Sequence, residues 1–193
     1  MRVRETTLPG VVIVEPQVFR DGRGFFLETW HARRFAEAGL GGAFVQDNHS
    51  RSLRGTLRGL HWQWRHPQAK LIRVTTGEVF DVAVDVRPES PAFGLWTATY
   101  LSGDNLRQLF VPRGFAHGFC VLSDEAHVEY KCSDYYDAEG ERGVRWDDPD
   151  LAIPWPVDAP LLSARDREHP TLRELFGRGP AEGGRPAAQR ITR

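Results

Sequence analysis

One histidine stands in a setting suited to proton transfer. The segment RGLHWQ, residues 58–63, places His61 among bulky, amide and cationic neighbours, just ahead of the run that begins at Lys70. An imidazole titrates near neutral pH, so His61 can serve as a general base. A lone histidine is more often a surface or packed core residue, and neighbouring groups must support this assignment.

A second histidine, His117, lies in FVPRGFAHGFCVLS, residues 110–123. It follows a proline and a glycine at the spacing of the second motif of cupin barrels. Metal-binding cupins complete a mononuclear site with a His-x-His pair from their first motif. Here His61 is followed two positions later by Gln63, and His66 is too far along the chain to restore the pair on one strand face. The sequence therefore predicts no metal site.

Organic acid and base chemistry remains. It needs an acid opposite the base and a cation that stabilises the enolate formed between two proton transfers. Lys70 and Arg58 are the candidate cations, and the candidate acids are Tyr130, Tyr135 and Tyr136 in VEYKCSDYYD. Such cations are more often solvated and tyrosines more often packed, so no single one decides the matter.

The elements that must position these groups are mostly strands. Short apolar runs separated by Gly, Pro, Asp and Ser dominate residues 10–132, without helices of crossover length between them. This spacing favours an all-β jelly roll or antiparallel β-barrel over a parallel sheet. Two short helices are expected at 31–40 and 171–176. The expected strands cover 11–16, 24–30, 70–77, 78–86, 96–102, 107–112, 117–123 and 127–133.

The strand expected at 78–86, EVFDVAVDV, has one apolar face and one face that carries Asp81 and Asp85. In a barrel, a polar inner face of this kind can line a ligand cavity.

The length of 193 residues fits one domain, which we place at residues 1–176. Four prolines between 149 and 160 exclude regular central strands there and predict an extended wrap. Residues 177–193 are rich in Gly, Pro and Arg and predict a flexible C-terminal tail.

Composition excludes several classes of protein. No apolar run approaches the roughly 20 residues that a membrane span needs. The net charge of −1 disfavours a nucleic-acid partner. Cys120 and Cys132 form no CxxC motif, which argues against a thiolate metal cluster or a disulfide framework. The amino terminus lacks the pattern of a secretory signal, so a cytoplasmic location is expected.

Taken together, the motifs resemble those of the dTDP-4-dehydrorhamnose 3,5-epimerases, cupin-like enzymes that act on sugar nucleotides. The segments RGFF, QDNHSRS, LRGLHWQ, KLIRVTTGEVFDVAVDVR, FVPRGFAHGF, YKCSDYY, WDDP and LSARD occur in the family's order, over about residues 10–170. The resemblance implies that His61 is the base, that Asp166 in LSARD is its carboxylate partner, and that Tyr130 is the opposing acid. It also implies that Lys70 lies near the C4 oxygen of the sugar.

The same resemblance implies a set of substrate-binding residues and a homodimer. The amino-terminal segment is similar to one that reaches into the partner subunit, so Arg23 and Glu28 are expected to serve the neighbouring site. Arg165 stands where many relatives have lysine, which changes the shape of the charge near the nucleotide. The implied substrate-binding residues are Arg23, Glu28, Gln46, Asp47, Asn48, Arg58, His117, Glu141 and Arg165.

The expected reaction is epimerisation of dTDP-4-dehydro-6-deoxy-D-glucose at C3 and C5, without a cofactor or a metal. Three alternatives remain open at this point: a related enzyme that inverts one carbon only, a non-catalytic sugar-binding cupin, and a metal-dependent cupin oxygenase or isomerase.

Overall fold

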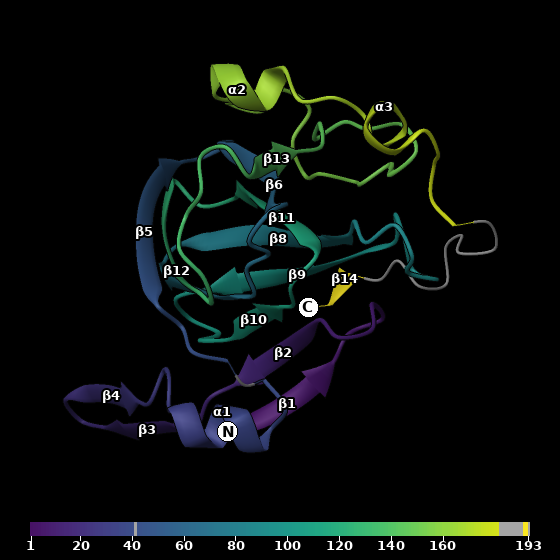
Figure 1. The fold of residues 1–193 in the computed structure, drawn as a ribbon. Coiled ribbons are helices and arrows are strands. Elements are labelled where there is room, and N and C mark those ends of the chain that lie inside the picture. The colour runs from purple at the N-terminus through teal and green to yellow at the C-terminus, as the bar shows by residue number, and fades with distance from the viewer. Residues whose placement is uncertain (41, 182–190, 193) are drawn as a thin grey trace.

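The computed structural model describes residues 1–40, 42–181 and 191–192, and strands dominate it (Figure 1). They form two six-stranded sheets and a separate two-stranded hairpin. The strands are β1 (Arg2–Glu5), β2 (Val12–Glu15), β3 (Val18–Asp21), β4 (Gly24–Leu27), β5 (Gln46–Leu53), β6 (Leu57–Gln63), β7 (Lys70–Thr76), β8 (Glu78–Asp85), β9 (Trp96–Ser102), β10 (Gln108–Val111), β11 (Phe115–Val121), β12 (Glu125–Cys132), β13 (Glu141–Gly143) and β14 (Ile191–Thr192). The helices are α1 (Ala32–Glu37), α2 (Ala164–Arg167) and α3 (Leu172–Phe176).

The first sheet has the order β1-β2-β10-β7-β12-β5 and the second has the order β13-β6-β11-β8-β9-β14. Alternate side chains of both sheets, among them Ile72, Val128 and Phe119, form one buried cluster. This pattern follows from the period of two along a strand, which turns every second side chain toward the facing sheet. The two sheets therefore share one core.

The outer face of the second sheet is covered by the segment after β13. Leu151, Ile153 and Trp155 pack there against Phe80 of β8 in a separate apolar cluster. Trp96 Nε1 donates a hydrogen bond to the Leu151 carbonyl oxygen at 2.8 Å. The expected extended wrap is therefore present, because its prolines exclude strands while its aromatic and aliphatic side chains still bury against the sheet.

All described strand pairs are antiparallel except the pairing of β14 with β9. The expected all-β, cupin-like fold with a few short helices is thus confirmed.

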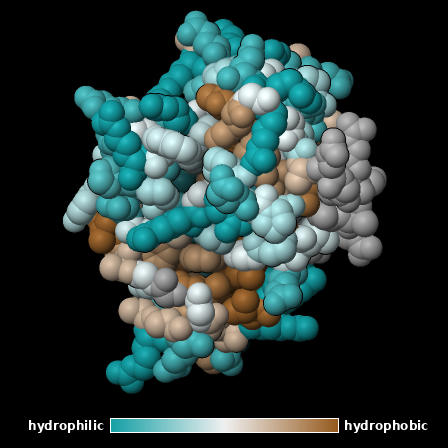
Figure 2. All heavy atoms as spheres, turned by 45° about the vertical axis from the view of Figure 1, so that its right-hand side comes forward, coloured by the Kyte–Doolittle hydropathy of each residue, from teal (hydrophilic) through white to brown (hydrophobic). Residues whose placement is uncertain are grey.

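Within the described part of the chain, no helix is long and apolar enough to cross a membrane. Figure 2 shows a mostly hydrophilic surface on which apolar side chains gather mainly in the lower half of the view.

Each expected strand overlaps an observed one, and both expected helices form. Sequence reasoning missed β1, β3, β5, β6, β13, β14 and α2. The interpretation of the polar face of β8 was wrong. Asp81 and Asp85 are fully buried, and their carboxylates bind His117 and Arg87 instead of lining a cavity.

The predicted tail, residues 177–193, falls partly outside the described residues. In the described part, the Arg178 guanidinium lies 4.5 Å from the centre of the Phe93 ring. The Ala181 N–H donates to the Phe93 carbonyl oxygen at 2.9 Å. Ile191 pairs with Ala98 of β9. These described positions therefore contact the domain.

Candidate active site

A cavity of about 250 Å³ opens where β5, β6, β7, β12 and β13 meet. It holds an imidazole, an ammonium and a phenol, those of His61, Lys70 and Tyr130. Of the implied substrate-binding residues, Gln46, Asn48 and Glu141 line it as well. The remaining lining residues are Trp62, Gln63, Gln68, Cys132 and Tyr136.

His61 is held by a buried carboxylate. Its Nε2 lies 2.5 Å from Asp166 Oδ1, and the Asp166 side chain is only 6% exposed. Ser163, the N-cap of α2, donates its hydroxyl to Asp166 Oδ2 at 2.8 Å and accepts the Asp166 N–H. The short helix therefore fixes the carboxylate behind the imidazole, as the resemblance implied.

The charge of Asp166 follows from these contacts. Burial alone would raise the pKa of the Asp166 carboxyl, but the neighbouring His169 and His61 imidazoles and the Ser163 hydroxyl outweigh it and hold that pKa well below the usual range. A carboxylate bound to Nε2 accepts the proton of that nitrogen. The other ring nitrogen of His61, Nδ1, is then the one that can take a proton from a substrate.

The backbone at His61 depends on a close strand contact. His61 pairs with His117 of β11 on one side and with Gly143 of β13 on the other. Two positions earlier, Gly59 has a φ of 138°, and a Cβ there would lie 2.5 Å from the Gly118 Cα. Glycine at position 59 is required for this approach, which carries β6 past β11 with His61 at the cavity.

Lys70 and Tyr130 lie together on neighbouring strands, with the Lys70 ammonium 5.8 Å from the centre of the Tyr130 ring. Burial lowers the pKa of Lys70, and negative neighbours such as Glu141 oppose that shift. Burial raises the pKa of the Tyr130 phenol, and the charge of Arg58 opposes it. Within the described residues, no hydrogen bond or ion pair occupies the Lys70 ammonium. It is therefore available to an oxygen of a ligand.

The rim of the cavity carries a second polar group. Glu141 accepts a hydrogen bond from the Tyr136 hydroxyl at 2.7 Å and forms an ion pair with Arg165. Arg58 lies on β6 with its Nε 3.0 Å from the Ser52 hydroxyl. Glu141 and Arg165 therefore lie at the cavity, and Arg58 lies close enough to Tyr130 for its charge to act on that phenol.

His117 lies beside His61 in the strand register but is 6% exposed. Its Nε2 is 2.8 Å from Oδ1 of the fully buried Asp81. The structure thus places His117 next to the base and engages it with its own carboxylate. It does not line the cavity.

Three expected site residues lie away from this cavity. Arg23 is at the tip of the β3–β4 hairpin, paired with Asp21 and 91% exposed in its side chain. Glu28 follows the hairpin and pairs with Arg34 of α1. In Figure 1 the hairpin extends from the body at the end opposite α2, which carries Asp166. Within one chain, Arg23 and Glu28 are therefore not brought to His61.

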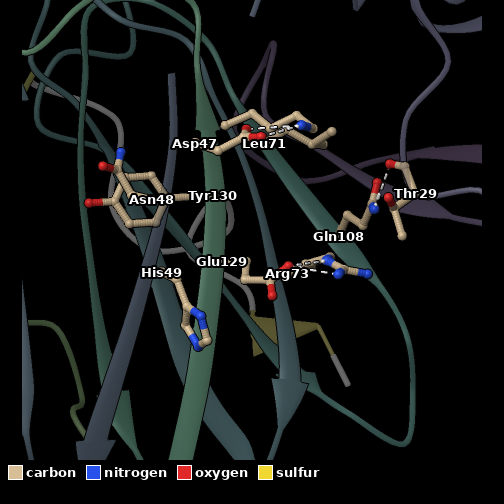
Figure 3. Close-up of a pocket in the computed structure, with 10 residues that line it drawn as sticks. Thr29, Asp47, Asn48, His49, Leu71, Arg73, Gln108, Glu129 and Tyr130 are labelled. Atoms are coloured by element: carbon tan, nitrogen blue, oxygen red, sulfur yellow. Dashed lines mark hydrogen bonds and ion pairs between the residues drawn. The ribbon is translucent and has the colours of Figure 1, made fainter. Parts of the chain in front are cut away.

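Asp47 is the third residue that lies away from the cavity. Its side chain lies on the face of β5 opposite to Gln46 and Asn48. It forms an ion pair with Lys131 at 2.9 Å and lines a second cavity of about 330 Å³ on the outer face of the first sheet (Figure 3). Arg73 and Glu129, which also line that cavity, bind each other. The charged groups of this outer cavity are thus already paired.

Sequence reasoning did not single out Gln68, Cys132 or His169 as site residues. Gln68 precedes β7 and Cys132 ends β12, opposite Lys70 in the strand register. The alternation of β12 could have placed Cys132 on the same face as Tyr130. His169, Asp166 and His61 form the one group of potential metal ligands among the described residues. The metal prediction considered only spacing within β6 and could not include groups from the α2 region.

The arrangement suits proton transfer next to a carbonyl group. A general base backed by a carboxylate, a protonated phenol and a free ammonium share one cavity. An ammonium stabilises the oxyanion of an enolate best where water is partly excluded, and the half-buried position of Lys70 meets that condition.

Known proteins share this sequence and fold. The model of the dTDP-4-dehydrorhamnose 3,5-epimerase family matches residues 5–174. The chain is 55% identical over 170 residues to dTDP-4-dehydrorhamnose 3,5-epimerase of Pseudomonas aeruginosa, covering 87% of this chain and 94% of that one. It is 44% identical over 181 residues to dTDP-4-dehydrorhamnose 3-epimerase of Streptomyces niveus, covering 93% and 87%.

A crystal structure of a 3,5-epimerase also has a similar fold. The dTDP-6-deoxy-D-glucose-3,5-epimerase of Legionella pneumophila, in complex with dTDP-4-keto-L-rhamnose, superposes with a TM-score of 0.87 at 48% identity. The match covers 89% of this chain and 93% of that one. The chain therefore belongs to the dTDP-4-dehydrorhamnose 3,5-epimerase family.

Proposed function

We propose that the protein epimerises dTDP-4-dehydro-6-deoxy-D-glucose at C3 and C5, giving dTDP-4-dehydro-L-rhamnose. The observation that carries this proposal is the His61–Asp166 pair, 2.5 Å apart, at a cavity that also contains Lys70 and Tyr130. The P. aeruginosa and L. pneumophila relatives are named for the 3,5-reaction.

The C4 ketone acidifies the protons on both neighbouring carbons. His61 removes one of them through Nδ1, and the negative charge moves to the C4 oxygen, where Lys70 stabilises it. Tyr130 then gives a proton to the opposite face of the carbon, which inverts it. No electrons leave the sugar, so the reaction needs no redox cofactor. One enolate oxygen serves both carbons, and the same groups can therefore act twice.

The nucleotide is proposed to lie across a homodimer interface. The β3–β4 hairpin exposes Phe19, Phe25 and Phe26, the last of them 69% exposed. Aromatic side chains gathered on a projecting hairpin are typical of a surface that another chain covers. We propose that the partner's cavity receives Arg23 from this hairpin, together with Glu28 just after it, where the arginine neutralises the diphosphate.

Analytical ultracentrifugation tests the dimer. The wild-type chain should sediment as a dimer, and Phe26→Arg should shift it toward the monomer and raise KM more than it lowers kcat. A wild-type chain that sediments as a monomer at micromolar concentration contradicts the assignment of the hairpin. A cytoplasmic location remains a prediction from the sequence.

Inversion at a single carbon is the second candidate. It is favoured by the S. niveus relative, whose name gives a 3-epimerase and whose match covers 93% of this chain. A single-centre enzyme needs the same base, acid and cation, because only the presentation of the sugar changes.

Incubation with dTDP-4-dehydro-6-deoxy-D-glucose in deuterated water separates these candidates. Proton NMR of the product should show deuterium and inverted configuration at both C3 and C5. Inversion at C3 alone would establish the single-centre reaction, and absence of exchange at both carbons would overturn epimerase function.

A further inference from the structure

Behind the base, three potential metal ligands converge on one point. Asp166 Oδ1 lies 2.5 Å from His61 Nε2 and 3.6 Å from His169 Nε2. All three ligand atoms lie within 4.8 Å of one another. The two imidazole rings meet edge to face, with their centres 5.3 Å apart. Two nitrogens and one carboxylate oxygen therefore lie within reach of one ion.

His169 does not line the cavity that holds His61, Lys70 and Tyr130. Its side chain is only 9% exposed, and its Nε2 has no hydrogen-bond partner among the described residues at normal hydrogen-bond geometry. A buried polar atom without a partner is destabilising, so such atoms are rare unless a water or an ion binds them. The ring packs closely against the backbone of Gly143, because a Cβ there would lie 2.3 Å from it. This nitrogen thus lies 3.6 Å from Asp166 Oδ1, without a hydrogen bond of normal length.

We propose that His61, Asp166 and His169 form a binding site for a zinc ion, and that zinc bound there inhibits the enzyme. Two imidazoles and a carboxylate are ligands that Zn²⁺ prefers, with a fourth position left for water. Ligand atoms of a tetrahedral zinc site lie about 3.3 Å apart, as bond lengths of about 2.0–2.2 Å require. The two contacts to Asp166, at 2.5 and 3.6 Å, reach that spacing with shifts of less than about 1 Å, and the two imidazole nitrogens lie within 4.8 Å of each other.

Zinc is expected to inhibit because a neutral imidazole carries only one proton. This expectation rests on the proposed function, in which His61 is the base. In the free enzyme His61 carries that proton on Nε2, toward Asp166, and Nδ1 keeps a lone pair for the substrate. Zinc on Nε2 takes that position, and the proton then resides on Nδ1. A protonated Nδ1 cannot accept the substrate proton. The metal therefore inactivates the base without entering the sugar site.

Zinc binding is measured by isothermal titration calorimetry of the metal-free protein with Zn²⁺, and inhibition by the deuterium exchange assay at matched Zn²⁺ concentrations. His169→Gln removes one ligand and keeps a side chain of similar size. It should weaken zinc binding and zinc inhibition by at least about tenfold, the loss that removal of even an outer-shell partner can cause. Mg²⁺, which prefers oxygen ligands, should not inhibit.

His127→Gln is the matched control. His127 and His49 form an exposed imidazole pair, 2.9 Å apart on the outer face of the first sheet, which is the competing place for zinc to bind. This variant should keep the activity and zinc sensitivity of the wild type. If it abolishes zinc binding, or if His169→Gln binds zinc as tightly as the wild type, the proposed site is wrong.

Crystals of the wild-type protein soaked in Zn²⁺ provide a test that needs no variant. Anomalous scattering at the zinc edge should place one ion between His61, Asp166 and His169. An ion elsewhere, with none at this position, overturns the proposal. Zinc bound at the site of a protein without epimerase activity would leave the site standing and refute the proposed function.

Discussion

The carboxylate behind the base can be tested by Asp166→Asn, which removes the charge and keeps the shape. During catalysis His61 becomes an imidazolium beside Asp166, whose carboxylate oxygen lies 2.5 Å from the ring nitrogen. Two unit charges centred about 4 Å apart attract by about 4 kcal/mol at an effective dielectric constant of 20. Since each 1.36 kcal/mol changes the rate tenfold, kcat should fall by about 10³-fold.

An asparagine can also donate a hydrogen bond to Nε2 and so favour the tautomer with its proton on Nδ1, which adds to the loss. The assay is the initial rate of deuterium incorporation, followed by NMR, with the thermal transition measured on the same sample. Asp147→Asn is the control, because it breaks a half-exposed ion pair with Arg145 and should change kcat by less than about twofold. A correctly folded Asp166→Asn variant that keeps a third of the wild-type kcat would refute the role of the carboxylate.

Three further predictions follow from the same geometry. Tyr130→Phe should reduce the rate of inversion by about 10²–10⁴-fold, while deuterium exchange on the face of the sugar next to His61 continues. If NMR shows that inversion and exchange fall by the same factor, Tyr130 is not the acid. Lys70→Met should lower kcat by about 10²–10³-fold, whereas Lys131→Met, on the outer face of the same sheet, should not change steady-state rates. Because the pKa of the Asp166 carboxyl is lowered by folding, the ionised carboxylate stabilises the folded protein above about pH 4, and this stabilisation is lost as the pH falls further. The difference in Tm between the wild type and Asp166→Asn should therefore shrink from pH 6 to pH 3. A difference that stays the same would contradict this linkage.

The strands with buried apolar faces could be predicted because their pattern depends on local sequence. Strands β5 and β6 could not be predicted in that way. Along β5, Gln46 and Asn48 on one face line the polar cavity and are followed on that face by two serines. Asp47 and Arg51 on the other face form ion pairs with residues of β12. This strand therefore lacks an apolar face, and it is held by its pairing with β12.

The site could be predicted only in part for a similar reason. The His61 motif marked a base, but its partner Asp166 lies 105 positions further along the chain and meets it only through the wrap that brings α2 to β6. The resemblance to the epimerase family implied the pairing of His61 with Asp166, whereas the periodicity of the sequence could not predict it. His169 was missed because its position depends on a turn after α2 that no local pattern indicates. The opposite direction of Asp47 could have been inferred from the alternation of β5, since Gln46 and Asn48 both face the cavity.

In the proposed mechanism, His61 is the one base that acts at both carbons of one bound sugar. The measurement is deuterium incorporation at C3 and at C5 by His61→Asn, after calorimetry with dTDP has shown that the variant still binds the nucleotide. We predict that exchange falls at both carbons by the same factor, about 10²–10⁴-fold. Exchange that persists at either carbon at the wild-type rate would show a second base and contradict the account.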